Sequence, residues 1–328
     1  MNRSIFRIAI VRLSALGDIV NTAVVLQIIH NHYPDAIIDW FVEEAFAPVL
    51  SEHPLLNEVI SIPLKRVKKQ KSISLLRTTI RSLRSREPYE HIIDAQGLLK
   101  SAIVTSFLRG PVHGFDRHSA REGIASWFYT TTSAIAYDTN IIKRNVMVIT
   151  QALNIPYSDA LIEQKLPVFA YTPATENEQK IALVIGASWP SKCYPKEHFA
   201  TLCGLLPYPC HLVWGSQSEY QDALWIVQHC TNAIITDKMS LPQLVNFIAS
   251  CTLTIGNDTG PTHIAWAMNR PSITLFGPTN ERMIYPTAVN VGIKSPSIVD
   301  IYHINRNDFS INEISPETIS TKALKLLC

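Results

Sequence analysis

The sequence lacks the cysteine patterns of a disulfide framework or a zinc site. Its six cysteines all lie in the second half, and none forms a Cys-x-x-Cys pair or a cysteine–histidine cluster with zinc spacing. Buried, reduced thiols are therefore expected. No Asp-x-Asp pair occurs either, so the simplest sequence signal for a metal-bound diphosphate is missing.

Long hydrophobic runs are also missing. No apolar run approaches the ~18–20 residues that a membrane-spanning helix needs. The apolar stretch 8–11 near the N-terminus is too short for a signal peptide and leads directly into a polar loop. With 328 residues, 47% hydrophobic and 17% charged, the chain has the composition of a cytoplasmic globular protein with two domains.

Acidic residues are absent from one long segment. Residues 65–86, KRVKKQKSISLLRTTIRSLRSR, contain nine lysines and arginines and no acid. Arg77, Arg81 and Arg84 are spaced to share one face of a helix. A solvated basic face would explain each residue singly. Nine cations without a counter-charge favour an anionic partner: a membrane surface, a nucleic acid or an acidic substrate.

Short apolar strands alternate with helical stretches in both halves of the chain. The first half begins with a strand at 7–11, a polar loop and a helix over 19–33, and ends with an amphipathic stretch near 141–153. The second half alternates more regularly and ends in a helix with Ser315 as N-cap and Pro316 at its first position. This alternation predicts an α/β protein with two doubly wound parallel sheets, and ligands bound at the carboxyl ends of the strands, in a cleft between the halves.

The loop after the first strand, RLSALGD, holds one glycine and matches neither a dinucleotide-binding nor a triphosphate-binding loop. Asp18 lies where the following helix begins. It is predicted either to cap that helix or to act as a general base. Spacing alone favours the cap.

Two turns of the second half have the features of an anion site. GASWPSKCYP (186–195) combines small residues with Lys192 just before a predicted helix. NDTGPTH (257–263) places Pro261 at the first helical position, which leaves the amides of Thr259, Gly260, Thr262 and His263 free for a phosphate. Asp258 would repel a diphosphate but could accept hydrogen bonds from hydroxyls, so the two turns together suggest a nucleotide sugar. His263 could equally be a packed first-turn histidine.

These residues carry a family resemblance. LSALGDIVNT, IDAQGLLKSA, GFDRHSARE, KCYP, MSL and NDTGPTHIAWAMNRPSITLFGPT occur in the order and at the spacing of the lipopolysaccharide heptosyltransferases of glycosyltransferase family 9. The chain resembles the type I group most, over roughly residues 5–280 and thinly between 130 and 179.

The resemblance implies a GT-B fold, in which two Rossmann-like domains face a central cleft. The expected parts are an acceptor-binding domain (1–160), a linker (161–179), a nucleotide-sugar-binding domain (180–310) and a C-terminal helix (311–328) that returns to the first domain. The implied reaction is inverting transfer of heptose from ADP-heptose to a Kdo hydroxyl of Kdo-lipid A, without a metal or other cofactor. The enzyme would be cytoplasmic and peripheral on the anionic inner membrane, with no nucleic-acid partner.

The resemblance also implies roles for individual residues. Asp18 corresponds to the catalytic base and Lys192 to a lysine that binds the donor diphosphate. The donor would be bound by Ser188, Glu219, Met239, Asp258, Thr259, Gly260 and His263. The acceptor would be bound by Lys65, Arg66, Lys68, Lys69, Lys100 and Arg121.

The sequence departs from the family pattern at Ala187, where a hydroxyl is usual, and at Pro261, which removes one backbone donor. The alternatives are a type II heptosyltransferase acting on heptosylated core, a two-domain sugar-nucleotide epimerase, and a nucleotide-sugar-binding module without catalysis.

Overall fold

The structure is a computed structural model that describes residues 6–172 and 178–328. The chain divides into two compact units, Met1–Ala170 and Tyr171–Cys328. The division lies inside the expected linker 161–179, of which residues 173–177 lie outside the described residues. The linker's earlier part packs on the first unit: the Gln27 side-chain amide donates to the carbonyls of Leu166 and Pro167, and His53 Nε2 lies 2.8 Å from the Val168 carbonyl.

The first unit contains a 6-stranded parallel sheet in the order β3-β2-β1-β4-β5-β6. Its strands are β1 (Arg7–Val11), β2 (Ile37–Glu43), β3 (Glu58–Ile62), β4 (His91–Asp94), β5 (Val112–Phe115) and β6 (Thr131–Ser133). Its helices are α1 (Leu16–Ala23), α2 (Val25–His32), η1 (Ala47–Val49), α3 (Leu64–Gln70), α4 (Ile73–Arg84), α5 (Leu99–Thr105), η2 (Gly123–Phe128), α6 (Ile141–Ala152) and α7 (Ala160–Glu163), where η denotes a 3₁₀ turn.

The second unit contains another 6-stranded parallel sheet, in the order β12-β11-β10-β7-β8-β9. Its strands are β7 (Ile181–Val184), β8 (Cys210–Val213), β9 (Ala233–Ile235), β10 (Leu253–Asn257), β11 (Ser272–Phe276) and β12 (Asn290–Lys294). Its helices are η3 (Pro190–Lys192), α8 (Lys196–Leu205), α9 (Gln217–His229), α10 (Leu241–Ser250), α11 (Gly260–Ala267), η4 (Glu281–Met283), η5 (Ser310–Glu313) and α12 (Pro316–Leu327).

Both sheets have the doubly wound order of a Rossmann fold, as the alternation of strands and helices predicts. The chain reverses direction across the sheet between β1 and β4 in the first unit and between β7 and β10 in the second. At such a switch point the loops after the two strands lead in opposite directions, and ligands usually bind in the crevice between them.

The central strands are buried along nearly their whole length because helices cover both faces of each sheet. In β1, every residue after Arg7 is buried, and β7 and β11 are buried throughout. Burial of each large aliphatic side chain contributes about 1.5–3 kcal/mol. The sheets are therefore rigid platforms for the loops at their carboxyl ends.

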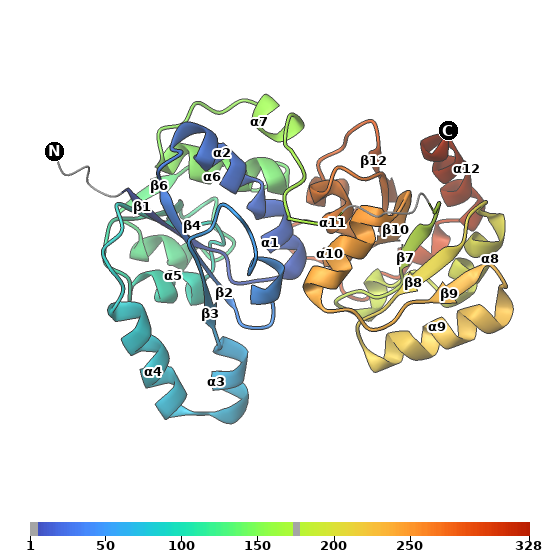
Figure 1. The fold of residues 1–328 in the computed structure, drawn as a ribbon, viewed down its shortest axis with the longest axis horizontal. Coiled ribbons are helices and arrows are strands. Elements are labelled where there is room, and N and C mark those ends of the chain that lie inside the picture. The colour runs from blue at the N-terminus through green and yellow to red at the C-terminus, as the bar shows by residue number, and fades with distance from the viewer. Residues whose placement is uncertain (1–5, 173–177) are drawn as a thin grey trace. The chain divides into compact units, whose positions relative to one another are not determined.

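Helices α3 and α4 form a hairpin that extends beyond the edge strand β3 (Figure 1). The Ser72 side chain caps α4 by accepting a hydrogen bond from the Leu75 amide at 3.2 Å. Arg77, Arg81 and Arg84 lie on this helix, as their spacing predicts. We refer to residues 64–84 as the basic hairpin.

The final helix, α12, begins as predicted: the Ser315 side chain accepts from the Thr318 amide at 3.2 Å, and Pro316 is the first helical residue. It packs mainly on α8 of the second unit, and Ser320 donates to the Leu205 carbonyl. Its apolar residues Ile319 and Ala323 are buried in that unit's core. The expectation that residues 311–328 return to the first unit stays a prediction.

The predicted helix over 19–33 is in fact two helices, α1 and α2, separated at Val24. All six cysteines are free, but Cys328 is exposed, and Cys193 and Cys230 are only partly buried. Across residues 6–172 and 178–328, no helix is both long and apolar enough to span a bilayer.

Candidate active site

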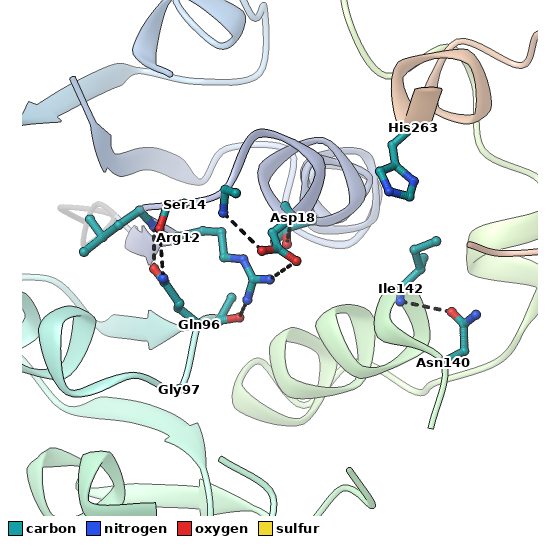
Figure 2. Close-up of polar contacts among 12 residues, drawn as sticks. Arg12, Ser14, Asp18, Gln96, Gly97, Asn140, Ile142 and His263 are labelled. Carbon is teal, nitrogen blue, oxygen red and sulfur yellow. Dashed lines mark hydrogen bonds and ion pairs between the residues drawn. The ribbon is translucent and has the colours of Figure 1, made fainter. Parts of the chain in front are cut away.

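Asp18 lies at the carboxyl end of β1, on the third residue of α1. Its Oδ1 is 2.9 Å from Nη2 of the buried Arg12, and its Oδ2 accepts from the Ala15 amide at 3.1 Å (Figure 2). The N-cap residue is Ala15, so the prediction that Asp18 is the N-cap is wrong. Asp18 is instead the third residue of the helix, and its carboxylate accepts a hydrogen bond from the amide of the N-cap residue. Its side chain is 30% exposed, which leaves it open to a substrate.

The loop after β4 supports the loop that carries Asp18 (Figure 2). Arg12 donates to the Ala95 carbonyl, and Gln96 accepts from the Leu13 amide at 2.8 Å and donates to Ser14 Oγ at 3.3 Å. Gly97 has φ +67°, a conformation that favours glycine. Through these hydrogen bonds, the IDAQG segment joins the loops that follow β1 and β4, the two strands at the switch point.

The Asp94 side chain holds the loop after β4 in place. Its Oδ1 accepts from the amides of Gln96 and Gly97 at 2.8 and 3.1 Å, and its Oδ2 accepts from the Tyr129 hydroxyl at 2.8 Å. Burial raises the pKa of the Asp94 carboxyl despite these hydrogen bonds. Asp94 thus acts on the loop geometry from a fully buried position.

Lys100 lies at the same edge of the first sheet. Its Nζ donates to Ser14 Oγ at 2.5 Å. Burial lowers the pKa of Lys100, and among the charges acting on that pKa Glu43 raises it and Lys65 lowers it. The structure therefore brings Lys100, Lys65 and the buried Glu43 into one electrostatic cluster.

The other predicted acceptor residues are spread over the first unit. Lys65 Nζ lies 5.1 Å from the centre of the Phe46 ring, and Arg66 is 3.3 Å from Glu44. Lys68 and Lys69 are exposed on α3, and Arg121 is exposed in the loop after β5. Among the described residues, no hydrogen bond or ion pair joins Arg121 to the basic hairpin.

In the second unit, Asp258 lies at the carboxyl end of β10 and is surrounded by donors. Its Oδ2 is 2.6 Å from Lys192 Nζ and accepts from Thr279 Oγ1 at 2.9 Å, while its Oδ1 is 3.0 Å from His263 Nε2. Burial acts to raise the pKa of Asp258, but the Lys192 ammonium and His263 outweigh it and hold that pKa well below its usual value. Lys192 is therefore a buried side chain paired with a carboxylate. Asp258 holds it in place.

The N-terminus of α11 provides fewer free amides than predicted. The helix begins at Gly260, so Pro261 is its second residue. The His263 amide donates to the Thr259 carbonyl at 3.3 Å, which removes it from the predicted anion site. The amides of Thr259, Gly260 and Thr262 remain at the first turn, beside the Asp258–Lys192 pair.

Asn257 joins the two turns of the second unit. Its Oδ1 accepts from the Tyr194 amide at 3.0 Å, and its Nδ2 donates to the carbonyls of Ile185 and Gly186 at 3.0 and 3.2 Å. The sequence gives no sign of this role, because the partners lie more than sixty residues earlier in the chain. Asn257 thereby fixes the 186–195 loop against the 257–263 turn.

Glu219 belongs to the same edge of the sheet. It accepts from the amides of Gly215 and Ser216 at 2.6 and 3.2 Å as the third residue of α9. A Cβ added at Gly186 would lie 2.2 Å from the Glu219 carboxyl carbon. The missing side chain at Gly186 therefore makes room for Glu219. Ser188 is exposed in the loop after β7, and Met239 is half-buried after β9.

Trp189 was not identified from the sequence. Its ring has Lys192 Nζ at 5.1 Å and the Arg306 guanidinium at 5.0 Å. Such cation–π contacts place two positive charges around one indole. The loop 295–309 thus adds a cation to the neighbourhood of Lys192.

Among the residues that the structure describes, no group of three or more histidine, cysteine, aspartate or glutamate side chains has the arrangement of a metal site. The expectation of a reaction without a metal stays a prediction.

Comparison with known proteins gives consistent matches. The model of glycosyltransferase family 9 (heptosyltransferase) matches residues 76–300. The lipopolysaccharide heptosyltransferase 1 of Campylobacter coli is 37% identical, over 95% of this chain and 96% of its own length. The enzyme of the same name from Escherichia coli K12 is 30% identical, over 85% of this chain and 90% of its own. A solved structure of the E. coli heptosyltransferase WaaC with ADP-2-deoxy-2-fluoro heptose has a TM-score of 0.80 at 26% identity, covering 98% of this chain and 99% of that one.

Proposed function

Because the chain belongs to glycosyltransferase family 9, the heptosyltransferases, and is a glycosyltransferase, we propose that it adds heptose to the lipopolysaccharide inner core. The donor is ADP-L-glycero-β-D-manno-heptose and the acceptor is a Kdo hydroxyl of Kdo-lipid A. The observation that carries the proposal is the partly exposed Asp18 carboxylate, held by Arg12 and the Ala15 amide at the switch point of the first sheet.

The second unit binds the donor. Lys192 and the amides of Thr259 and Gly260 face the diphosphate, and Ser188 lies on the neighbouring loop. Asp258 already accepts three hydrogen bonds from the protein, so its main role is to orient Lys192 and His263. A carboxylate offers about four acceptor positions, so one remains for a heptose hydroxyl. Glu219 and Met239 line the path of the ribose and adenine.

The first unit activates the acceptor. Asp18 takes the proton of the Kdo hydroxyl, whose oxygen forms the new bond to the heptose anomeric carbon as the bond from that carbon to the ADP oxygen breaks. One direct displacement inverts the anomeric centre and needs no covalent enzyme intermediate. The salt bridge from Arg12 orients the Asp18 carboxylate, so Arg12 is a positioning residue.

The leaving diphosphate gains negative charge in the transition state. Lys192 and the N-terminal amides of α11 are preorganised for this charge, which supports a reaction that runs without a metal. The donors are fixed in advance by Asp258 and Asn257, so little reorganisation is required when the bond breaks.

The acceptor is anionic, and the first unit offers cations to it. Lys100 and Lys65 share the edge of the sheet with Asp18, and Arg66, Lys68, Lys69 and Arg121 add further positive charge. These residues bind the Kdo carboxylates and the lipid A phosphates. The same charges hold the enzyme at the cytoplasmic face of the inner membrane.

The test is a comparison of two acceptors, Kdo-lipid A and Kdo-lipid A that already carries one heptose, each incubated with ADP-heptose. The proposal predicts transfer to the first and not to the second. Transfer only to the heptosylated acceptor would assign the chain to the type II reaction. ADP-heptose binding without transfer to either acceptor would leave only a binding module.

A further inference from the structure

Helix α4 carries an apolar stripe that continues past the core it packs against. Ile73, Leu76, Ile80 and Leu83 follow one another at intervals of three, four and three residues, so they share one helix face. Leu83 is 2% exposed, whereas Leu76 is 40% and Ile73 66% exposed. The stripe is therefore buried at its C-terminal end and open to solvent at its N-terminal end.

The attachment of α4 explains this gradient. Leu83 belongs to the core cluster of the first unit, and Thr78, Thr79 and Ser82 line a pocket against residues 60–63 at the end of β3. The helix residues before Thr78 extend beyond that contact. Helix α3, the other arm of the basic hairpin, has no buried residue and does not close over the stripe. In Figure 1 the turn between α3 and α4 is the part of the hairpin farthest from the sheet.

Unpaired positive charges surround the exposed end of the stripe. Lys68, Lys69, Lys71, Arg77 and Arg81 make no ion pair within the described part of the chain, and the hairpin contains no acid. By contrast, Lys65 and Arg66 at its base contact Phe46 and Glu44. An exposed apolar face with a lysine- and arginine-rich polar face is the pattern of a helix that lies in the interface of an anionic bilayer.

Nucleic acid fits this surface less well. Residues 64–84 contain no aromatic side chain on which a base could stack. A phosphate backbone would also leave Ile73 and Leu76 in water, whereas a lipid interface removes them from water.

We propose that the basic hairpin docks the first unit on an anionic lipid bilayer, with Ile73 and Leu76 in the apolar layer and the surrounding lysines and arginines at the headgroups. The inference deepens the proposed function, on which it rests for a lipid-borne acceptor. The base of the hairpin follows β3 at the carboxyl edge of the sheet, and the Lys65 amide donates to Glu43 at 3.1 Å. The docking element is therefore joined directly to the edge of the sheet that carries Asp18.

The test uses the full chain and co-sedimentation with two kinds of vesicle. One contains phosphatidylglycerol and phosphatidylethanolamine, and the other contains only phosphatidylcholine. The wild type is expected to bind the anionic vesicles at low salt and to lose that binding at high salt. Ile73→Ser with Leu76→Ser is expected to lower binding about tenfold, with an unchanged melting temperature because both side chains are exposed.

A matched control removes two other exposed apolar side chains of the same unit, Ile124 and Trp127 on η2, which are 47% and 74% exposed. Ile124→Ser with Trp127→Ser is expected to bind vesicles as the wild type does. The proposal is overturned if the wild type does not bind anionic vesicles, or binds both vesicle types equally. It is also overturned if the hairpin variant binds normally, or if only the η2 variant loses binding, which would move the docking surface to η2.

A second readout separates docking from transfer. With a deacylated, water-soluble acceptor, the Ile73→Ser, Leu76→Ser variant is expected to transfer heptose at the wild-type rate, and with the acceptor embedded in anionic vesicles at a rate reduced about tenfold. Equal reduction on both acceptors would contradict a docking role. If the wild type transferred heptose to neither acceptor, the proposed function would fail, while the vesicle-binding result would still decide the docking surface.

Discussion

Asp18 is the residue on which the proposed chemistry depends most. We expect Asp18→Ala and Asp18→Asn to lower kcat by at least about 100-fold, since a general base contributes roughly 10²–10⁴-fold. ADP affinity should stay within about threefold of wild type, because the proposed donor site uses second-unit residues only. Steady-state kinetics and calorimetric ADP binding provide the two measurements.

The control for Asp18 is Asp138→Ala, which removes an exposed carboxylate of the same unit. It should leave both quantities unchanged. If Asp18→Asn retained more than a tenth of wild-type activity, Asp18 would be no more than the capping residue that its Ala15 contact makes it.

The Lys192–Asp258 pair is buried, so its two charges depend on one another. We expect Lys192→Met or Asp258→Asn alone to lower the free energy of unfolding by about 3 kcal/mol, because each leaves a buried partner without its counter-charge. The double variant should lose less than the sum of the two. Denaturant unfolding of the four proteins measures the coupling, and strictly additive losses would contradict a dependent pair.

At the scale of elements, the end of β7 is shaped by what Gly186 lacks. A Cβ there would lie 2.2 Å from the Glu219 carboxyl carbon, so Gly186→Ala should displace Glu219 from the start of α9. We expect ADP affinity to fall by about tenfold, the size of one lost hydrogen bond of about 1.4 kcal/mol. Calorimetric titration with ADP makes the measurement.

Gly204→Ala is the matched control, because a Cβ at Gly204 meets nothing within 4 Å. It lies inside α8, where alanine stabilises a helix by roughly 0.5–1 kcal/mol relative to glycine. ADP affinity should not change in this variant. An equal loss in both variants would mean that Gly186 acts through general stability and not through Glu219.

Elements were easier to predict from the sequence than the contacts between their ends. Apolar runs such as RIAIV and the Ser315–Pro316 start of α12 are local signals, and the structure confirms both. The hydrogen bond from the Leu13 amide to Gln96 and the one from Thr279 to Asp258 join residues far apart in the sequence. Such contacts depend on which strands become neighbours, and no local pattern specifies that order.

Two further differences from expectation are local: the helix break at Val24, and the hydrogen bond from the His263 amide to the Thr259 carbonyl. The sequence 19–33 contains no glycine or proline that would indicate its division into α1 and α2. At the N-terminus of α11, the helix starts one residue earlier than Pro261 suggests, and this shift uses the His263 amide. A single residue of error in a helix start thus changed the set of amides predicted for the phosphate.

At the scale of the whole molecule, the GT-B fold class is confirmed, with two Rossmann-like units of equivalent strand order. The alternation of strands and helices predicted the two doubly wound sheets, and the family resemblance predicted their GT-B arrangement. The short edge strands β6 and β12 were not predicted, because TTS and NVGIK are too short or too polar to stand out.

The stability of the protein should respond to acid through Asp258. Its pKa is lower in the folded state than the value of about 4 expected when unfolded. The ionised carboxylate therefore stabilises the fold fully above about pH 4, and this stabilisation is lost as the pH falls further, toward the folded pKa. We expect the difference in unfolding free energy between wild type and Asp258→Asn to shrink below about pH 4. A difference that stayed constant from pH 7 to pH 3 would contradict the assignment.

The central claim is heptosyl transfer with Asp18 as base and with protein groups at the diphosphate. The most direct measurement is mass spectrometry of Kdo-lipid A after incubation with ADP-heptose and EDTA, in parallel for the wild type and Asp18→Ala. The account predicts a mass gain of one heptose with the wild type, undiminished by EDTA, and none with the variant. A gain that EDTA abolishes, or an equal gain with both proteins, would contradict it.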